Sequence, residues 1–135
     1  MGMNIKRFVL AAVAAFVFVF AFEFVLHGIL LKSIYEATSN LWRPMGSGTK
    51  YSLFMLMSQV GYSTVAAFIF TRHYEARGIG EGVRFGLYIG LLLASLEVGT
   101  YCYLPIPVKL TIAWVVGGLL KGLGTGTAVA LVYKN

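Results

Sequence analysis

FVLAAVAAFVFVFAFEFVLHGILL, residues 8–31, is apolar throughout except for one acid, Glu23, and one imidazole, His27. About 20 apolar residues in a helix are enough to cross the ~30 Å hydrocarbon core of a bilayer. Glu23 and His27 lie four positions apart, so both side chains fall on the same face of a helix. The stretch therefore predicts a membrane-spanning helix with a polar stripe.

The composition extends this prediction to the whole chain. Hydrophobic residues make up 59% of the 135 positions and charged residues only 12%, whereas soluble domains carry about 25% charged residues. Three further apolar runs predict membrane-spanning helices over 51–70, 83–103 and 108–132. We expect an all-α polytopic membrane protein, an antiparallel bundle of four transmembrane helices that forms a single domain over 1–135.

Two links between the predicted helices carry local signals. Ser33 and Glu36 have the spacing of a capping box, which predicts a short interfacial turn or helix over about 33–40. The glycines and serine of Met45 to Thr49 predict a flexible link before the second span.

Small residues recur every four positions in the last two predicted helices, and such ridges allow two helix backbones to approach closely. The two ridges are Gly82, Gly86, Gly90 and Ala94 in one helix, and Gly118, Gly122, Gly126 and Ala130 in the other. The turn LPIP at 104–107 ends one helix and begins the next. We therefore expect a closely packed antiparallel hairpin, with the glycines serving packing rather than phosphate binding.

Ionisable side chains inside the predicted spans are costly, at roughly 2.5 to 3.5 kcal/mol near the bilayer centre, so each is expected to face the bundle and find a partner. The group consists of Glu23, His27, Glu97 and Lys121, with the amide of Gln59 at a similar depth. From their positions we expect them to gather in the half of the bilayer beside the first and third links. Lys121 is expected to pair with Glu23 or Glu97, and the other acid to be protonated or bonded to His27 or Gln59.

Three roles are compatible with this group. It can be a polar staple that fixes which helices meet, or a path for protons or a small solute. A metal site made from Glu23, His27 and Glu97 is a weak third candidate, because no span contains a second histidine. No Ser or Cys motif accompanies His27, so we expect neither an enzyme nor a bound cofactor.

The net charge of +6 does not indicate nucleic acid, because the basic residues stand at the ends of the predicted spans, where they meet lipid phosphates. Six lie at the termini and second link, against four in the other two links: Lys6, Arg7, Arg72, Arg77, Arg84 and Lys134 against Lys32, Arg43, Lys50 and Lys109. The excess predicts that both termini are cytoplasmic.

Several segments resemble a group of small bacterial four-span membrane proteins of unknown function. They are FEFVLHGILLK at 22–32, Tyr35, Glu36, LWRP at 41–44, RFGLYIGLLL at 84–93, LPIP at 104–107 and AWVVGGLLKGL at 113–123. The chain departs from that pattern after Pro44, where MGSG replaces an expected acidic stretch. The resemblance implies a bacterial cytoplasmic membrane protein and carries no activity that can be transferred.

Two functions are compatible with the whole sequence. The first is an accessory or structural subunit of a larger membrane complex or of a homo-oligomer, because four short spans with almost no soluble mass offer mainly lateral surface. The alternative is a transporter or channel module for protons or a small solute that uses the intramembrane Glu, His and Lys side chains. The expected partners are the lipid bilayer and a membrane protein or further copies of the chain.

Overall fold

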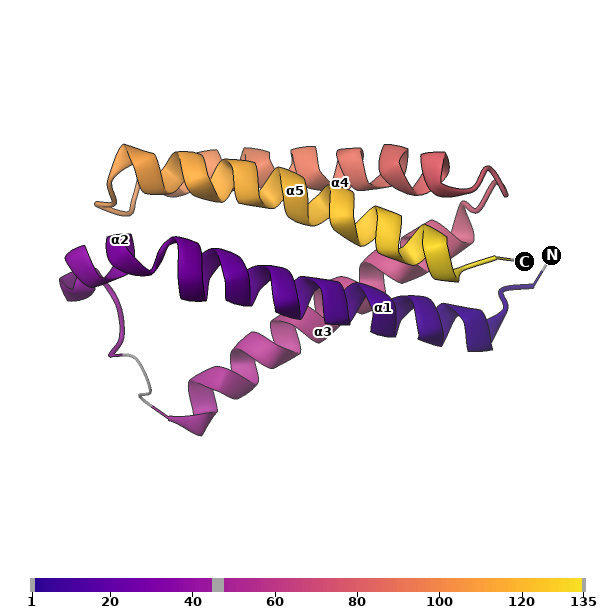
Figure 1. Cartoon of the computed structure of the whole chain (residues 1–135), viewed down its shortest axis with the longest axis horizontal. Helices are drawn as coiled ribbons and strands as arrows, with labels where there is room; N and C mark the ends of the chain where they lie inside the picture. The colour runs from indigo at the N-terminus through magenta and orange to yellow at the C-terminus, as the bar shows by residue number, and fades with distance from the viewer. Residues whose placement is uncertain (1, 45–47, 135) are drawn as a thin grey trace.

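A computed structural model describes residues 2–44 and 48–134, and this part of the chain is helical with no β-strand. Four of its helices are long and apolar enough to cross a membrane (Figure 1). They are α1 (Ile5–Glu23) continued by η1 (Phe24–Leu30), α3 (Thr49–Arg72), α4 (Ile79–Thr100) and α5 (Val108–Val132). The protein is therefore a multi-pass membrane protein with an all-α four-helix bundle. The predicted link over Met45 to Thr49 lies partly outside the described residues, which omit 45–47.

The helix bounds follow the predicted ones at α5 and differ by one to four residues elsewhere. The largest shift is at α4, which begins at Ile79 rather than 83. Its first turn contains Gly80 and Glu81, whose low hydropathy hides the helix start, but Glu81 is 5% exposed. The Glu81 carboxylate accepts hydrogen bonds from the backbone N–H groups of Glu75 at 2.7 Å and Arg77 at 2.9 Å. A buried acid thus joins the second link to α4.

The first link contains a short helix, but not the predicted capping box. Helix α2 (Lys32–Ala37) follows η1 at once and is succeeded by the 3-10 turn η2 (Ser39–Leu41). Ser33 lies inside α2, and no side chain caps its N-terminus. Thr38 holds the segment instead, since its hydroxyl donates to the carbonyl of Ile34 at 2.8 Å and accepts from the indole of Trp42 at 2.8 Å.

Helices α4 and α5 approach each other along the two ridges of small residues. A Cβ atom added to Gly86 would lie 2.6 Å from the carbonyl oxygen of Gly122, and one on Gly90 would lie 2.6 Å from that of Leu119. A Cβ on Gly126 would meet the Cα of Gly86 at the same 2.6 Å. The backbones are therefore too close for any side chain, as the repeating glycines predict.

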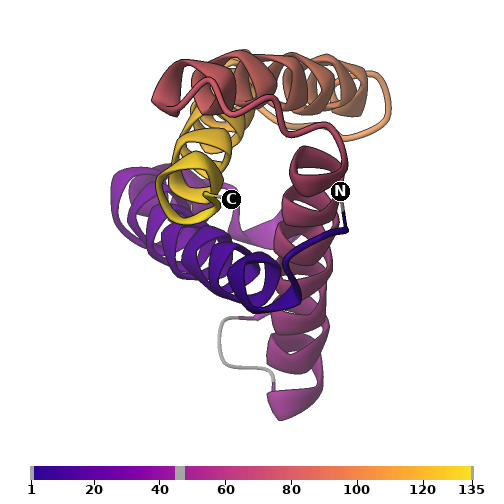
Figure 2. The ribbon, with the colours of Figure 1, turned by 90° about the vertical axis from the view of Figure 1, so that its right-hand side faces the viewer.

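The other helices pack beside this hairpin. Seen from the end that carries both termini, α5 lies between α4 and α1, and α1 lies between α5 and α3 (Figure 2). A buried core fills this end, with Ala11 and Ala15 of α1, Phe70 of α3 and Val129 of α5 among its members. Both termini and the second link thus share one end of the bundle (Figure 1).

Helix α3 crosses α1 obliquely, so that its first half diverges from the rest of the bundle (Figure 1). Positions 49–58 are all exposed, whereas Ala66, Ala67 and Phe70 in its second half are buried. At the end opposite the termini, a second core forms from Leu31, Ile106 and Leu110. The polar residues of the spans lie between these two cores.

Candidate functional site

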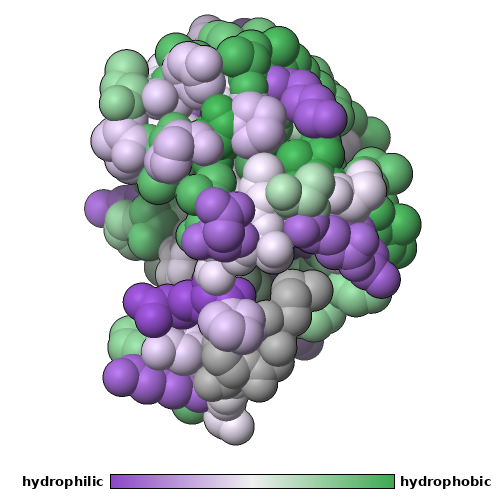
Figure 3. All heavy atoms as spheres, turned by 90° about the vertical axis from the view of Figure 1, so that its left-hand side faces the viewer, coloured by the Kyte–Doolittle hydropathy of each residue, from purple (hydrophilic) through white to green (hydrophobic). Residues whose placement is uncertain are grey.

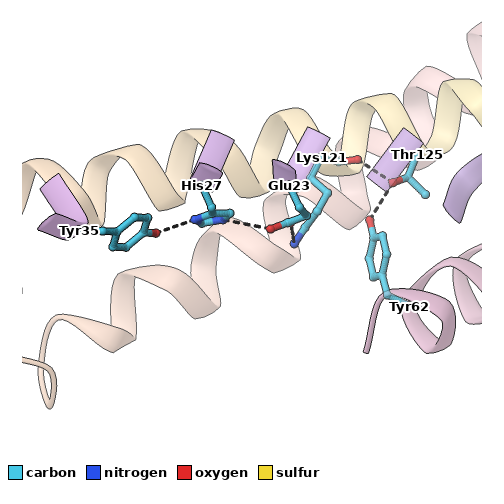
Figure 4. A network of polar contacts seen from close by, with 6 residues as sticks. All are labelled: Glu23, His27, Tyr35, Tyr62, Lys121 and Thr125. Carbon is cyan, nitrogen blue, oxygen red and sulfur yellow. Dashed lines mark hydrogen bonds and ion pairs between the residues drawn. The ribbon is translucent and has the colours of Figure 1, made fainter. Parts of the chain in front are cut away.

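Glu23 lies at the centre of a polar cluster and bonds to two partners at once (Figure 4). The other members of the cluster in this view are His27, Tyr35, Tyr62, Lys121 and Thr125. The ammonium group of Lys121 on α5 donates to one carboxylate oxygen, Oε1, at 2.7 Å. The imidazole Nε2 of His27 lies 3.0 Å from the other, Oε2. Opposite charges and directed hydrogen bonds offset the cost of placing these groups in the membrane. The cluster therefore joins the first and last spans.

The backbone changes its winding at this point. Glu23 is the last residue of α1, and His27 lies in the π-helix η1, where the N–H of Leu31 bonds to the carbonyl of Leu26 at 2.9 Å, five residues back. A π-helical turn is wider than an α-helical one and is often found at functional sites. Nothing in the hydropathy of the run signals it, because the run is apolar at nearly every position and has no period that could distinguish an α from a π turn.

His27 extends the cluster toward the first link. Its Nδ1 atom lies 2.6 Å from the hydroxyl of Tyr35, which also accepts the indole N–H of Trp114 at 2.8 Å. The carboxylate of Glu23 only accepts, so in the neutral imidazole Nε2 carries the proton and Nδ1 accepts from Tyr35. Burial raises the pKa of Tyr35, which keeps this hydroxyl protonated and able to donate.

Lys121 connects the cluster to α3. The Lys121 ammonium lies 5.6 Å from the centre of the Tyr62 ring, within the range of a cation–π contact. The Tyr62 hydroxyl donates to Thr125 at 3.2 Å, and Thr125 donates to the Lys121 carbonyl at 2.7 Å (Figure 4). Sequence reasoning missed Tyr35, Tyr62, Trp114 and Thr125 as members of the cluster.

Glu97 and Gln59 do not share in these bonds. Within residues 2–44 and 48–134, neither the Glu97 carboxylate nor the Gln59 amide makes a side-chain hydrogen bond or an ion pair. Lys121 thus pairs with Glu23 and not with Glu97, and His27 also bonds to Glu23. Gln59 lies near the middle of α3, and its amide is not bonded to either acid in the described residues.

Two cavities border the cluster, and Glu23 and His27 line both. Cavity A has a volume of about 200 Å³ and lies among η1, α4 and α5. Its walls are Glu23, His27, Glu97, Trp114 and Lys121, together with Leu26 and two glycines of α5. Cavity B, of about 590 Å³, lies among the end of α1, η1, α2, η2 and the first half of α3, and it includes Gln59.

The geometry gives no support to the metal site that the sequence left as a weak candidate. Glu23 and His27 are in contact, whereas Glu97 lines the same cavity A without bonding to either of them. In the described part of the chain, no group of three or more His, Cys, Asp or Glu side chains is close enough to hold a metal ion.

The arrangement offers groups that can hold a proton and donors and acceptors that can bind a small polar molecule. Tyr35, His27, Glu23 and Lys121 form a continuous series of hydrogen bonds, and Glu97 faces the same cavity. No protein-family model, curated protein or solved structure matches the chain.

Proposed function

We propose that the protein is a membrane-embedded transport module for protons or a small polar solute, with cavity A as its binding site. The observation that carries the proposal is that the polar cluster borders a cavity and is not packed solid. A group that only fixes helix register is expected to have every polar atom paired, because unpaired buried groups destabilise the bundle. Glu97 departs from that expectation, since in the described residues its carboxylate faces cavity A without a partner.

The size and lining of cavity A fit such a role. A water molecule occupies about 30 Å³ in the liquid, so a volume of about 200 Å³ admits several waters or one small solute. Glu97 supplies an acceptor, Lys121 a donor, and His27 an imidazole whose two ring nitrogens can accept and donate hydrogen bonds. Carboxylates and histidines inside membrane helices are the usual components of proton relays.

The cluster is open to only one half of the membrane in this conformation. Tyr35 and His27 lead from the first link toward Glu23 (Figure 4). On the other side, toward the termini, Thr125 continues the hydrogen bonds from Lys121, and beyond it Ala11, Ala15 and Val129 belong to a fully buried apolar core. Transport across the whole membrane therefore requires a second conformation, or a partner or second copy that completes the path.

Flux into liposomes that contain the purified protein tests the proposal. Proton entry is followed with an internal pH-sensitive dye under an imposed potential, and entry of urea or glycerol by osmotic swelling. We expect flux well above that of protein-free liposomes and a loss of at least tenfold in Glu97→Gln. Glu75→Gln, which changes an acid outside the membrane, is the matched control and should retain the flux. Flux at the protein-free level for protons and both solutes would refute the proposal.

The second candidate is an accessory or structural subunit of a larger membrane complex or of a homo-oligomer. The divergence of α3 favours it, because positions 49–58 have an exposed, largely apolar surface. Mild-detergent extraction and chemical cross-linking from Lys50 test it. A single monomeric species with no cross-linked product would count against this candidate.

We further propose that the chain lies in a bacterial cytoplasmic membrane with both termini in the cytoplasm. The excess of Lys and Arg at the termini and second link supports this orientation. The only cysteine, Cys102, is exposed in the third link at the opposite end. A membrane-impermeant maleimide should therefore label Cys102 in cells with a permeabilised outer membrane, and labelling only after lysis would reverse the orientation.

A further inference from the structure

Cavity B has an apolar interior and reaches from the middle of the membrane to its surface. Phe20, Phe24 and Met55 line its deep part, and Trp42 and Arg43 lie at its outer end. Phe20 is ten residues before Leu30, which corresponds to about 15 Å along a helix. Tryptophan and arginine side chains are typical of the headgroup level. The cavity is therefore elongated along the direction of a lipid chain.

The outer rim of cavity B is positively charged. It carries two cations, Lys32 and Arg43, against one acid, Glu36. Lys32 and Glu36 are only loosely paired, at 3.9 Å, and both are well exposed. Arg43 is held by Tyr51, whose hydroxyl accepts its hydrogen bond at 3.2 Å and whose ring centre lies 4.6 Å from the guanidinium carbon.

The remaining acid of cavity B does not alter this balance. Glu23 lies in its deep wall, but its carboxylate is already bonded to Lys121 and His27. The net charge available to an occupant is thus positive and confined to the rim. Figure 3 views this end of the molecule, where hydrophilic side chains form separate patches among hydrophobic ones.

We propose that cavity B binds one anionic phospholipid of the surrounding bilayer. An acyl chain occupies the apolar space between η1 and the first half of α3, and the headgroup phosphate lies at Lys32 and Arg43. The volume of about 590 Å³ is within the range of ~300 to 1,000 Å³ typical of ligand pockets. A phospholipid matches both the apolar depth and the cationic rim. A helix of another protein matches only the first.

Tryptophan fluorescence provides the test, because Trp42 lines cavity B and Trp114 lines cavity A. The Trp114→Phe protein is placed in vesicles that contain phosphatidylglycerol or phosphatidylcholine with brominated acyl chains. Each basic residue near a membrane surface favours anionic lipid about fivefold. We expect half-maximal quenching of Trp42 fluorescence at a mole fraction of brominated phosphatidylglycerol at least fivefold lower than the mole fraction of brominated phosphatidylcholine that gives the same quenching.

Two pairs of variants separate cavity B from general lipid contact. The double variant Lys32→Gln/Arg43→Gln should lose the preference for phosphatidylglycerol. Lys109→Gln changes a cation at the same end of the bundle but outside the cavity, and it should keep the preference. Gly28→Leu narrows cavity B, and its Cβ meets only the Phe24 ring at 3.5 Å or more. Gly99→Leu is its control near the same membrane surface, because a Cβ there has open space. Only Gly28→Leu should reduce the quenching.

Native mass spectrometry of the unaltered protein gives an independent measurement that does not depend on the Trp114 substitution. Protein released from vesicles with equal amounts of the two lipids should retain one phosphatidylglycerol. Equal quenching by both brominated lipids, or a preference that survives Lys32→Gln/Arg43→Gln, would overturn the proposal. Protection of Trp42 from both lipids in a cross-linked dimer would assign cavity B to a second copy and would also overturn it. None of these results depends on transport through cavity A.

Discussion

Replacing Lys121 by methionine removes the strongest partner of Glu23 and keeps the length of the side chain. The two side chains are only 24% and 20% exposed, so the carboxylate left behind is poorly hydrated. Breaking one side of a buried ion pair destabilises a protein by about 3 to 5 kcal/mol. Because His27 still bonds to Glu23 and cavity A admits water, we expect the lower end, about 3 kcal/mol.

The double variant Glu23→Gln/Lys121→Met tests the cause of this loss. It removes both charges, and the glutamine can still accept the hydrogen bond from His27 Nε2. Replacing a buried ion pair by uncharged groups of similar volume often changes the free energy of unfolding very little. The double variant should therefore be more stable than either single variant, with a coupling free energy of at least about 2 kcal/mol in a double-mutant cycle.

Reversible unfolding in mixed micelles, followed by helix content, measures these differences. Lys109→Met is the matched control, since Lys109 is exposed in the first turn of α5 and makes no ion pair among the described residues. It should change stability by less than about 0.5 kcal/mol. A loss below that value in Lys121→Met, or a double variant whose loss equals the sum of the single losses, would refute the reasoning.

Three further outcomes follow from other parts of the molecule. Gly122→Leu should lower stability by at least about 3 kcal/mol, because its added atoms meet the backbone of α4, whereas Gly61→Leu, with open space around its Cβ, should be nearly neutral in a thermal melt. The hydrogen bond from Arg84 lowers the pKa of Glu75 below its ordinary 4.5, so the stabilisation from this pair is complete above that value and is lost as the pH falls through the folded-state pKa. A carboxyl NMR titration should show the lowered midpoint, and the midpoint should rise in Arg84→Gln but stay below normal, because Arg77 still pairs with Glu75. Ellman's reagent should react with Cys102 in the folded protein in detergent at the rate of a free thiol, because the side chain is exposed, and a rate that rises only on denaturation would contradict its position.

Much of the fold was predictable from the sequence because the bilayer imposes simple rules. Long apolar runs must form helices, since lipid offers no hydrogen bonds to the backbone. The repeats around Gly86 and Gly122 indicate a close helix pair, because only small residues allow that contact. The cost of an isolated charge likewise favours a pair between Lys121 and an acid.

The remaining features depend on three-dimensional detail that residue patterns do not encode. The choice of Glu23 over Glu97 as the partner of Lys121 depends on helix rotation, which is set by packing. Tyr35 joins the cluster only because η1 and α2 turn the chain back toward His27. The oblique course of α3 has no signal in its hydropathy.

The glycine contact between α4 and α5 also determines which parts of the protein can move. Glycine has no rotamers, so this interface contains few side chains that can rearrange to accommodate sliding or rotation, and the two helices are expected to move together as a rigid body. Helix α3 has the opposite character, because its first half contacts little and its second half is anchored in a core. Any conformational cycle of this protein is therefore expected to consist of a swing of α3, pivoting near Phe70, against a stationary hairpin.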